Sequence, residues 1–389
     1  MSKILITVRD PGPLQAVATI VNKLKEKNCV FVLASGIAEK LIVKDYQEQF
    51  LGVHLLLEST VLGKNVFTEK NKEGVPFFHT TFKSQIEEGY SLLVRSLEKL
   101  LTQIMPDKIL RTTPAYGYGI DEAIIDAAER IGILKCCYCY QESYFVGNDL
   151  FKLTNPVATV DDHARNFLIS KNISSTDVGW LNCGRFLSFR HYNEARALAR
   201  AKLNLNENNI AILYCTTATG NTKAEISHFK CFLSCVTTER IYIKFHPRTK
   251  NEERKKYIEC AEIKHFSVVD DLAFEECISF ADFIVSSASM INIDCILYQI
   301  FSKVSSFQTI SVFTKGEKTE EVIKSVFQGN SNDFLPCAGS VLTCENNYDI
   351  LNNQTDKLCT ELYNQAEKYF LLDEKKIYKN FCVYMDIEK

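Results

Sequence analysis

Apolar residues fall into short runs that alternate with amphipathic stretches along the chain. Residues 3–8 (KILITV) form a β-branched run that predicts a buried strand. A turn at 9–13 follows, residues 14–27 carry apolar side chains at helical spacing, and 29–34 form a second apolar run. This order of strand, helix and strand is the unit of a parallel, doubly wound sheet.

The alternation continues through the first half of the chain. It predicts helices at 92–104, at 121–131 and from 161 or 162, and strands at 108–113, 134–140 and 157–160. Gly132 is expected to end the second of these helices. Polar residues and glycines between 170 and 190 then predict a crossover to a second series.

The second α/β series begins after a helix predicted at 192–202. Its predicted elements are strands at 211–216, 240–245, 265–269 and 282–287, and helices at 251–262, 274–280 and 290–299. The tail from 352 to 380 reads as mostly helical. The predicted fold class is therefore α/β, with two Rossmann-like domains in tandem and a cleft between them. The expected boundaries are 1–175 and 176–345, with helices in 346–389 packing back toward the N-terminal domain.

Composition narrows the classes of protein. A chain of 389 residues exceeds one ordinary domain, and 24% charged residues with a net charge of −3 argue against a nucleic-acid partner. No apolar run is long enough for a transmembrane segment, and the N-terminus reads as a strand rather than a signal peptide. The expected location is cytoplasmic, which leaves peripheral contact with the inner face of a membrane open.

The 15 cysteines show no disulfide framework. Those at 136, 137 and 139 are interpreted as small apolar residues of a buried strand, because their spacing does not suit a zinc site. We expect no metal and no cofactor.

Polar residues follow three predicted strands of the second half. They are Thr216, Thr217 and Thr219 after the first, His246, Pro247 and Arg248 after the second, and Ser286, Ser287 and Ser289 at the third. Ligands of parallel sheets bind beyond the carboxyl ends of the strands. Hydroxyls, backbone N–H groups and a histidine at these ends favour a phosphate-bearing ligand.

The patterns K-x-H-P-R at 244–248 and A-D-x-x-V-S-S-x-S at 281–289 resemble the donor-binding lobe of GT-B glycosyltransferases. The closest resemblance is to the sialyltransferase-like and Kdo-transferase-like branch, which uses CMP-sugars. It implies that His246, Ser286 and Ser287 bind the phosphate of a nucleotide-sugar donor. It also implies transfer of a sialic-acid-like or Kdo-like sugar to a glycan or glycolipid acceptor, without a metal.

The first half would then hold the acceptor and the general base, for which an inverting transferase needs a carboxylate. Glu142, which follows a buried strand, is the first candidate, and Asp10 in the first strand-to-helix loop is the second. The acidic pair at 121–122 is interpreted as a favourable charge at a helix N-terminus. Arg9 and Arg111 either bind an anionic acceptor or face solvent.

Other classes are less favoured or stay open. The first loop lacks the G-x-G-x-x-G of dehydrogenases, and neither a Walker A motif nor a G-x-S-x-G elbow is present. A sugar-nucleotide 2-epimerase or hydrolase shares the His-Pro feature, although epimerases usually have Ser-Gly-Gly where this chain has Ser-Ser-Ala-Ser. A catalytically inactive, two-lobed nucleotide-binding protein is the other alternative.

Overall fold

The chain forms two compact units. The first comprises Met1–Arg185 together with Leu372–Lys389, and the second comprises Phe186–Leu371. The structure is a computed structural model. It describes residues 1–61, 87–113, 118–142, 149–183, 192–216, 222–237, 240–246, 249–287, 291–302, 308–313, 341–344, 363–364, 367 and 373–387.

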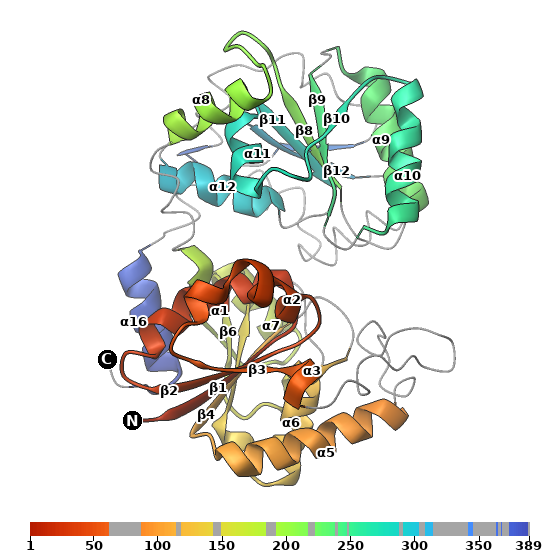
Figure 1. Ribbon diagram of the computed structural model, residues 1–389. Coiled ribbons are helices and arrows are strands. Elements are labelled where there is room, and N and C mark those ends of the chain that lie inside the picture. The colour runs from red at the N-terminus through yellow and green to blue at the C-terminus, as the bar shows by residue number, and fades with distance from the viewer. Residues whose placement is uncertain are drawn as a thin grey trace. The chain divides into compact units, whose positions relative to one another are not determined.

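The first unit is built on a parallel sheet, in which the described strands follow the order β3-β2-β1-β4-β5-β6-β7 (Figure 1). The strands are β1 (Lys3–Val8), β2 (Cys29–Ala34), β3 (His54–Leu57), β4 (Lys108–Thr112), β5 (Cys137–Gln141), β6 (Val157–Thr159) and β7 (Ser175–Asp177). The central strands are buried on both faces, which explains their nearly continuous apolar sequences.

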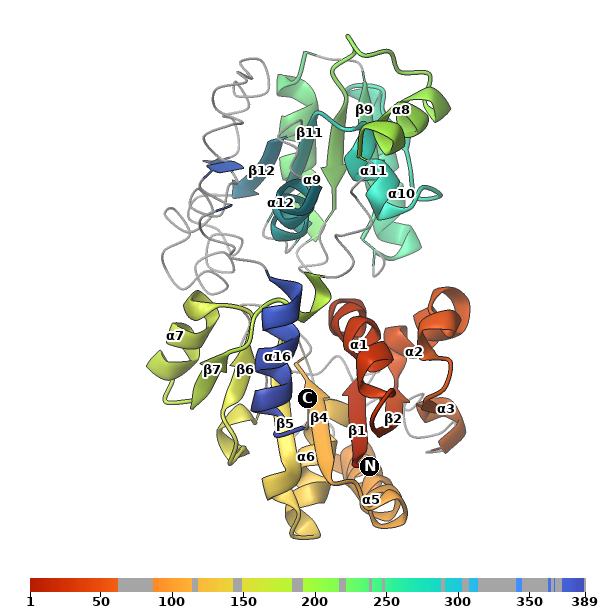
Figure 2. The same cartoon turned by 90° about the vertical axis from the view of Figure 1, so that its left-hand side faces the viewer.

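Helices cover both faces of this sheet. They are α1 (Pro11–Leu24), α2 (Gly36–Asp45), α3 (Glu58–Val61), α5 (Glu87–Ile104), α6 (Ile120–Arg130), α7 (Asp162–Ser170) and α16 (Glu374–Tyr384), with 3-10 turns η1 (Gln47–Phe50), η4 (Leu134–Cys136) and η5 (Leu150–Lys152). The apolar faces of α5 and α6 form one core with Leu5, Leu33 and Ile109. The helices α1 and α16 pack beside each other on the other face (Figure 2).

The second unit repeats the architecture, with the described strands in the order β10-β9-β8-β11-β12-β13. The strands are β8 (Ile212–Cys215), β9 (Ile241–Lys244), β10 (Ser267–Val268), β11 (Phe283–Ser287), β12 (Gln308–Phe313) and β13 (Val341–Cys344). Every pairing between them is parallel.

The helices of the second unit are α8 (Tyr192–Lys202), α9 (Thr222–Cys235), α10 (Asn251–Glu259), α11 (Phe274–Phe280) and α12 (Ile291–Ser302), with the 3-10 turn η7 (Cys260–Glu262). An aromatic core that includes Phe229, Phe232 and Tyr257 joins α9 and α10 to one face of the sheet. On the other face, Arg196 and Arg200 of α8 bind Asp282 at the start of β11.

Hydrophobic periodicity predicted most of these elements within a few residues, and the helices at 192–202 and 274–280 match in full. One predicted strand start was wrong, and one strand was not predicted. The strand expected at 134–140 begins only at Cys137, because residues 134–136 form a 3-10 turn after α6. The expected crossover contains β7, a short and polar edge strand.

The C-terminal helix belongs to the first unit. The hydroxyl of Tyr384 in α16 donates to the carbonyl of Pro156 and accepts from the amide of Cys139, 2.8 Å and 3.0 Å away. Glu374 pairs with Lys23 of α1 at 2.6 Å. This unit reaches past residue 175, near which the sequence suggested a boundary, because β7 pairs with β6. In the described part of the chain, no helix is long and apolar enough to cross a bilayer.

Candidate functional site

Each sheet has one place where the strand order reverses direction. In the first sheet, β1 is followed outward by β2 and β3 on one side and by β4 to β7 on the other. In the second sheet the corresponding place lies between β8 and β11. Loops diverge at such a switch point and leave a crevice at the carboxyl edge, where open α/β proteins bind ligands.

The switch point of the second sheet brings together residues that the sequence singled out. Thr216 follows β8 directly, and its hydroxyl accepts a hydrogen bond from the backbone N–H of His246 at 2.8 Å. His246 lies two residues beyond β9, the neighbour of β8. The hydroxyls of Thr216 and Thr249 are 3.4 Å apart. The ends of β8 and β9 are therefore joined by hydroxyl and amide groups.

Ser286 lies on the other side of this switch point. It pairs in register with Cys215, the last residue of β8, so it stands next to Thr216 across the strand pair. Its side chain is fully buried, and among the described residues its hydroxyl has no hydrogen-bond partner. A buried hydroxyl without a partner is costly, so Ser286 is a candidate for binding a ligand. Helix α12 begins at Ile291, shortly after β11 ends.

An ion pair supports the end of β9. The backbone N–H of Phe245 donates to Asp270 at 2.9 Å, and Arg254 binds the other oxygen of this carboxylate at 2.6 Å. Adjacent acids such as Asp270 and Asp271 usually face solvent in a turn. Asp270 instead fixes the backbone immediately before His246.

Several predicted nucleotide-binding residues lie outside the described residues. They are Thr217, Thr219, Pro247, Arg248, Ser289 and the side chain of Ser287. Their roles stay predictions.

In the first unit, the two predicted catalytic carboxylates belong to the same edge of the sheet. Asp10 is the N-cap residue of α1, and its side chain accepts no capping hydrogen bond from the described residues of that helix. Glu142 follows β5, and its carboxylate lies against Gly12 in the first turn of α1. A Cβ atom at residue 12 would be 2.8 Å from Oε2 of Glu142 and closer still to Oε1. Glycine at this position therefore makes room for the carboxylate.

The predicted solvent-facing alternative for Arg9 and Arg111 was wrong, because both side chains are buried. Glu122 lies between them. Its Oε2 is 3.7 Å from Nη1 of Arg9, and its Oε1 is 3.5 Å from Nη2 of Arg111. The same Oε2 accepts the backbone N–H of Gly119 at 2.8 Å. Glu122 is thus a buried ion-pair partner as well as a charge at a helix start.

Asp121 extends this buried cluster to β1. Thr7 donates its hydroxyl to Oδ1 of Asp121 at 2.6 Å, and Oδ2 accepts no hydrogen bond within the described part of the chain. Burial raises the pKa of both Asp121 and Glu122, and the charge of Arg9 opposes the rise. The sequence did not predict the cluster. Two acids at a helix start, with one arginine directly after β1 and another within β4, are the signal that could have revealed it.

Glu58 is a further buried acid at this edge. It starts α3, directly after β3, and its side chain is almost inaccessible. Burial raises the pKa of Glu58 to about 9, and the carboxylate of Glu39 adds to the rise while Arg9 opposes it. The group is therefore protonated at neutral pH. No motif marked it in the sequence.

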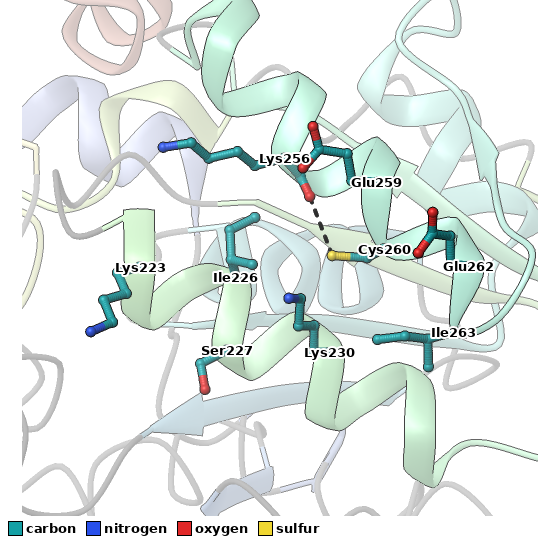
Figure 3. A pocket seen from close by; sticks show the side chains of 9 residues that line it. All are labelled: Lys223, Ile226, Ser227, Lys230, Lys256, Glu259, Cys260, Glu262 and Ile263. Atoms are coloured by element: carbon teal, nitrogen blue, oxygen red, sulfur yellow. Dashed lines mark hydrogen bonds between the residues drawn. The ribbon is translucent and has the colours of Figure 1, made fainter.

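The second unit also contains a groove with a charged lining. It has a volume of about 720 Å³ and lies between α9 and α10 (Figure 3). Its lining includes three lysines and two glutamates: Lys223, Lys230, Lys256, Glu259 and Glu262. Among the described residues, none of those predicted to bind the nucleotide lines it, and its mixed charges do not single out one class of ligand.

Neither a protein-family model nor a curated protein sequence matches this chain. Solved structures match it over nearly its full length. UDP-GlcNAc 2-epimerase from Neisseria meningitidis, bound to UDP-GlcNAc, aligns with a TM-score of 0.65 and 12% identity over 98% of both chains. S. aureus MnaA with UDP aligns at 0.61 and 12%, over 100% of this chain and 98% of the other. A glycosyltransferase from Rickettsia africae aligns at 0.57 and 10%, over 99% and 98%.

These similarities define the class of fold. The chain has the GT-B type of architecture, with two Rossmann-like units in tandem, as the sequence predicted. The predicted cleft between the units stays a prediction.

The similar structures support the GT-B part of the expected resemblance and give no support to the sialyltransferase-like and Kdo-transferase-like branch. They include UDP-GlcNAc 2-epimerases and a glycosyltransferase from Rickettsia africae.

Proposed function

We propose that this chain is an enzyme that acts on a nucleoside-diphosphate sugar, as a sugar-nucleotide 2-epimerase or hydrolase. The observation that carries the proposal is the position of the Glu142 carboxylate. It lies against Gly12 at the start of α1, the helix whose N-cap residue is Asp10. The carboxylates of Asp10 and Glu142 thus both lie at the start of α1, at the carboxyl edge of the sheet.

The chemistry of epimerisation explains why two such groups matter. Inverting a carbon atom requires a base that removes its proton and an acid that returns one, and neither step needs an acceptor. Carboxyl groups in different environments serve these two roles when their pKa values are driven apart. Glu142 is the first candidate for the base, and Asp10 is its partner. The overall similarity to UDP-GlcNAc 2-epimerases supports this assignment over transfer from a CMP-sugar.

Phosphate binding is assigned to the second unit. Thr216 and the buried Ser286 offer neutral hydroxyl groups at its switch point, and the imidazole of His246, two residues beyond β9, is expected to donate to a phosphate oxygen. The N-terminus of α12 would favour the negative charge of a diphosphate there. A similar structure was solved with UDP, and another with UDP-GlcNAc, so we expect uridine nucleotides to bind better than CMP.

Thermal stabilisation by nucleotides tests the phosphate site. A ligand that binds only the folded state raises the melting temperature. Among CMP, CDP, UMP, UDP, GDP, ADP and NAD, we expect UDP to produce the largest shift. The shift should fall in His246→Ala and persist in His265→Ala, a matched change at an exposed histidine of the same unit. A CMP-specific shift would restore the CMP-sugar hypothesis, and no shift with any nucleotide would refute the site.

Product analysis separates the reactions. UDP-GlcNAc alone, incubated with the protein in D₂O, should give the C2 epimer with deuterium at C2, observed by proton NMR. Release of UDP and free sugar without an epimer would indicate a hydrolase.

A glycosyltransferase is the second candidate, because the Rickettsia africae glycosyltransferase shares the fold and one base such as Glu142 suffices for transfer. It predicts no change in the donor until a glycan or glycolipid acceptor is added.

A further inference from the structure

The buried charges of the first unit adjoin the residues assigned to acid–base chemistry. Arg9 directly precedes Asp10, and the carbonyl of Asp10 accepts the N–H of Leu14 at 3.1 Å as α1 begins. Gly12, which borders Glu142, lies three residues after Arg9, in the first turn of α1. A side chain that fixes Arg9 therefore fixes the turn.

Arg9 is held closely on several sides. Its side chain crosses Gly119, where a Cβ atom would lie 3.1 Å from Cδ of Arg9. A Cβ at Gly36 would lie 3.4 Å from its Cγ. Its backbone carbonyl accepts the N–H of Ala38 at 3.0 Å. The carboxylate of Glu122 lies 3.7 Å from Nη1 of the guanidinium, and the charge of Arg9 also acts on Asp121 and Glu58.

Glu122 is itself immobilised from two further directions. The N–H of Gly119 donates to Oε2 at 2.8 Å, and Arg111 lies 3.5 Å from Oε1. Arg111 belongs to β4, where it stands opposite Thr7 of β1. Glu122 thus connects the start of α6 with the ends of both strands at the switch point.

This arrangement is poorly explained by stability alone. Removing charges from water is costly, and an apolar cluster of similar volume is often as stable as a buried ion pair or more stable. We propose that Glu122 is a positioning residue that, through Arg9, fixes the turn at residues 9–12 and with it the carboxylates of Asp10 and Glu142. The inference rests on the proposed function, because it takes those carboxylates as the acid–base groups.

A double-mutant cycle in turnover tests the coupling. Glu122→Gln and Arg9→Met should each lower kcat by about tenfold or more, with KM for UDP-GlcNAc nearly unchanged. If Glu122 acts through Arg9, the double variant should be no slower than Arg9→Met. Glu129→Gln, on the same helix but half exposed, should leave kcat unchanged. Additive losses, or a higher KM with kcat unchanged, would overturn the inference.

Amide hydrogen exchange decides the point independently of catalysis. Pro11 and Pro13 have no N–H, so the amides of Gly12 and Leu14 report on the turn. Glu122→Gln and Arg9→Met should speed their exchange by about fivefold or more while α16 keeps its protection. Unchanged exchange in both variants overturns the inference even if the enzyme is active. If the wild-type protein turns over no nucleotide sugar, the proposed function fails, and faster exchange would still support the role of Glu122 in holding the turn.

Discussion

The two sheets have their switch points at equivalent places but surround them with opposite chemistry. At the first, between β1 and β4, the protein fills the edge with its own charges: Arg9, Arg111, Asp121 and Glu122 are all buried there. At the second, the hydroxyls of Thr216, directly after β8, and of Ser286, near the end of β11, are neutral, and the ion pair of Asp270 with Arg254 supports the neighbouring strand β9. The two sheets thus share one architecture but differ in the side chains at their carboxyl edges.

The helix starts explain which edge suits a polyanion. Helix α1 begins Pro-Gly-Pro, so Gly12 is the one residue among its first three with an N–H, and the carboxylate of Glu142 lies against it. A phosphate there would meet few donors and a negative charge. At the second edge Thr216 directly follows β8 and Ser286 lies near the end of β11, and the first turn of α12 contains one acidic residue, Asp294, and no proline. We therefore expect phosphate binding and proton transfer to be separable by mutation.

The largest separation is expected at Glu142. Glu142→Gln keeps the shape of the side chain but removes its basicity, so turnover of UDP-GlcNAc should fall by about 10³-fold. Stabilisation by UDP should stay at the wild-type level, because the change lies in the first unit. Steady-state kinetics and thermal melts on the same preparations measure both.

Glu26→Gln, an exposed change near the far end of α1, is the matched control and should alter neither quantity. Full activity in Glu142→Gln would remove this residue from the mechanism. Loss of UDP stabilisation in the same variant would contradict the division between the two edges.

Gly12→Ala tests the same carboxylate without touching it. The added methyl group would collide with Glu142 and displace it, so we expect a loss of turnover of about 10²-fold, as small misplacements of catalytic groups produce. Alanine is otherwise favourable in a helix, so the collision alone should determine any loss of stability.

The double variant Gly12→Ala with Glu142→Ala removes the collision. Its melting temperature should equal or exceed that of Glu142→Ala alone. A lower melting temperature in the double variant would show that Gly12 is required for the backbone rather than for the carboxylate.

The sequence predicted the strand ends but not the partners of the residues beyond them. Apolar runs located β1, β4, β8 and β11, and chain order placed Thr216 and Ser286 at one edge because parallel strands end together. The pairing of Arg9 with Glu122 joins residues more than 100 positions apart, and no local pattern encodes it. The sequence did not predict edge strand β7 for a related reason, since a polar three-residue strand has no apolar periodicity.

The buried acids of the first edge should make its stability depend on pH. Folded Glu58 keeps its proton up to pH about 9, whereas in the unfolded chain it is lost near the ordinary value of 4.5. Between these values the folded state binds more protons, so this contribution to stability is present below pH 4.5 and falls by about 1.4 kcal/mol per pH unit above it. Glu58→Gln, which is always neutral, should match the wild type near pH 5 and exceed its free energy of unfolding at pH 8.5.

Urea unfolding at pH 5, 7 and 8.5 measures this difference. The exposed change Glu48→Gln should follow the wild type at every pH. If the free energy of unfolding changed with pH equally in Glu58→Gln and the wild type, Glu58 would be ionised in the folded protein.

The smallest expected effect is that of Ser286→Ala, which should leave stability unchanged or raise it while lowering the affinity for UDP. Ser286→Ala removes a buried hydroxyl that has no hydrogen-bond partner among the described residues, so stability should be unchanged or higher by about 1 kcal/mol. If this hydroxyl binds the phosphate, affinity for UDP should fall by about tenfold, since one hydrogen bond to a charged group is worth about 1.5–3 kcal/mol.

Ser234→Ala, which removes an exposed helix hydroxyl of the same unit, is the control and should change neither quantity. Isothermal titration with UDP and thermal melts of the free proteins measure the two effects separately. Undiminished UDP affinity in Ser286→Ala would exclude this hydroxyl from the phosphate site. A loss of stability would instead mean that the hydroxyl supports the fold. The contrast between the first edge, where the protein's own charges pair with one another, and the second edge would then no longer hold at Ser286.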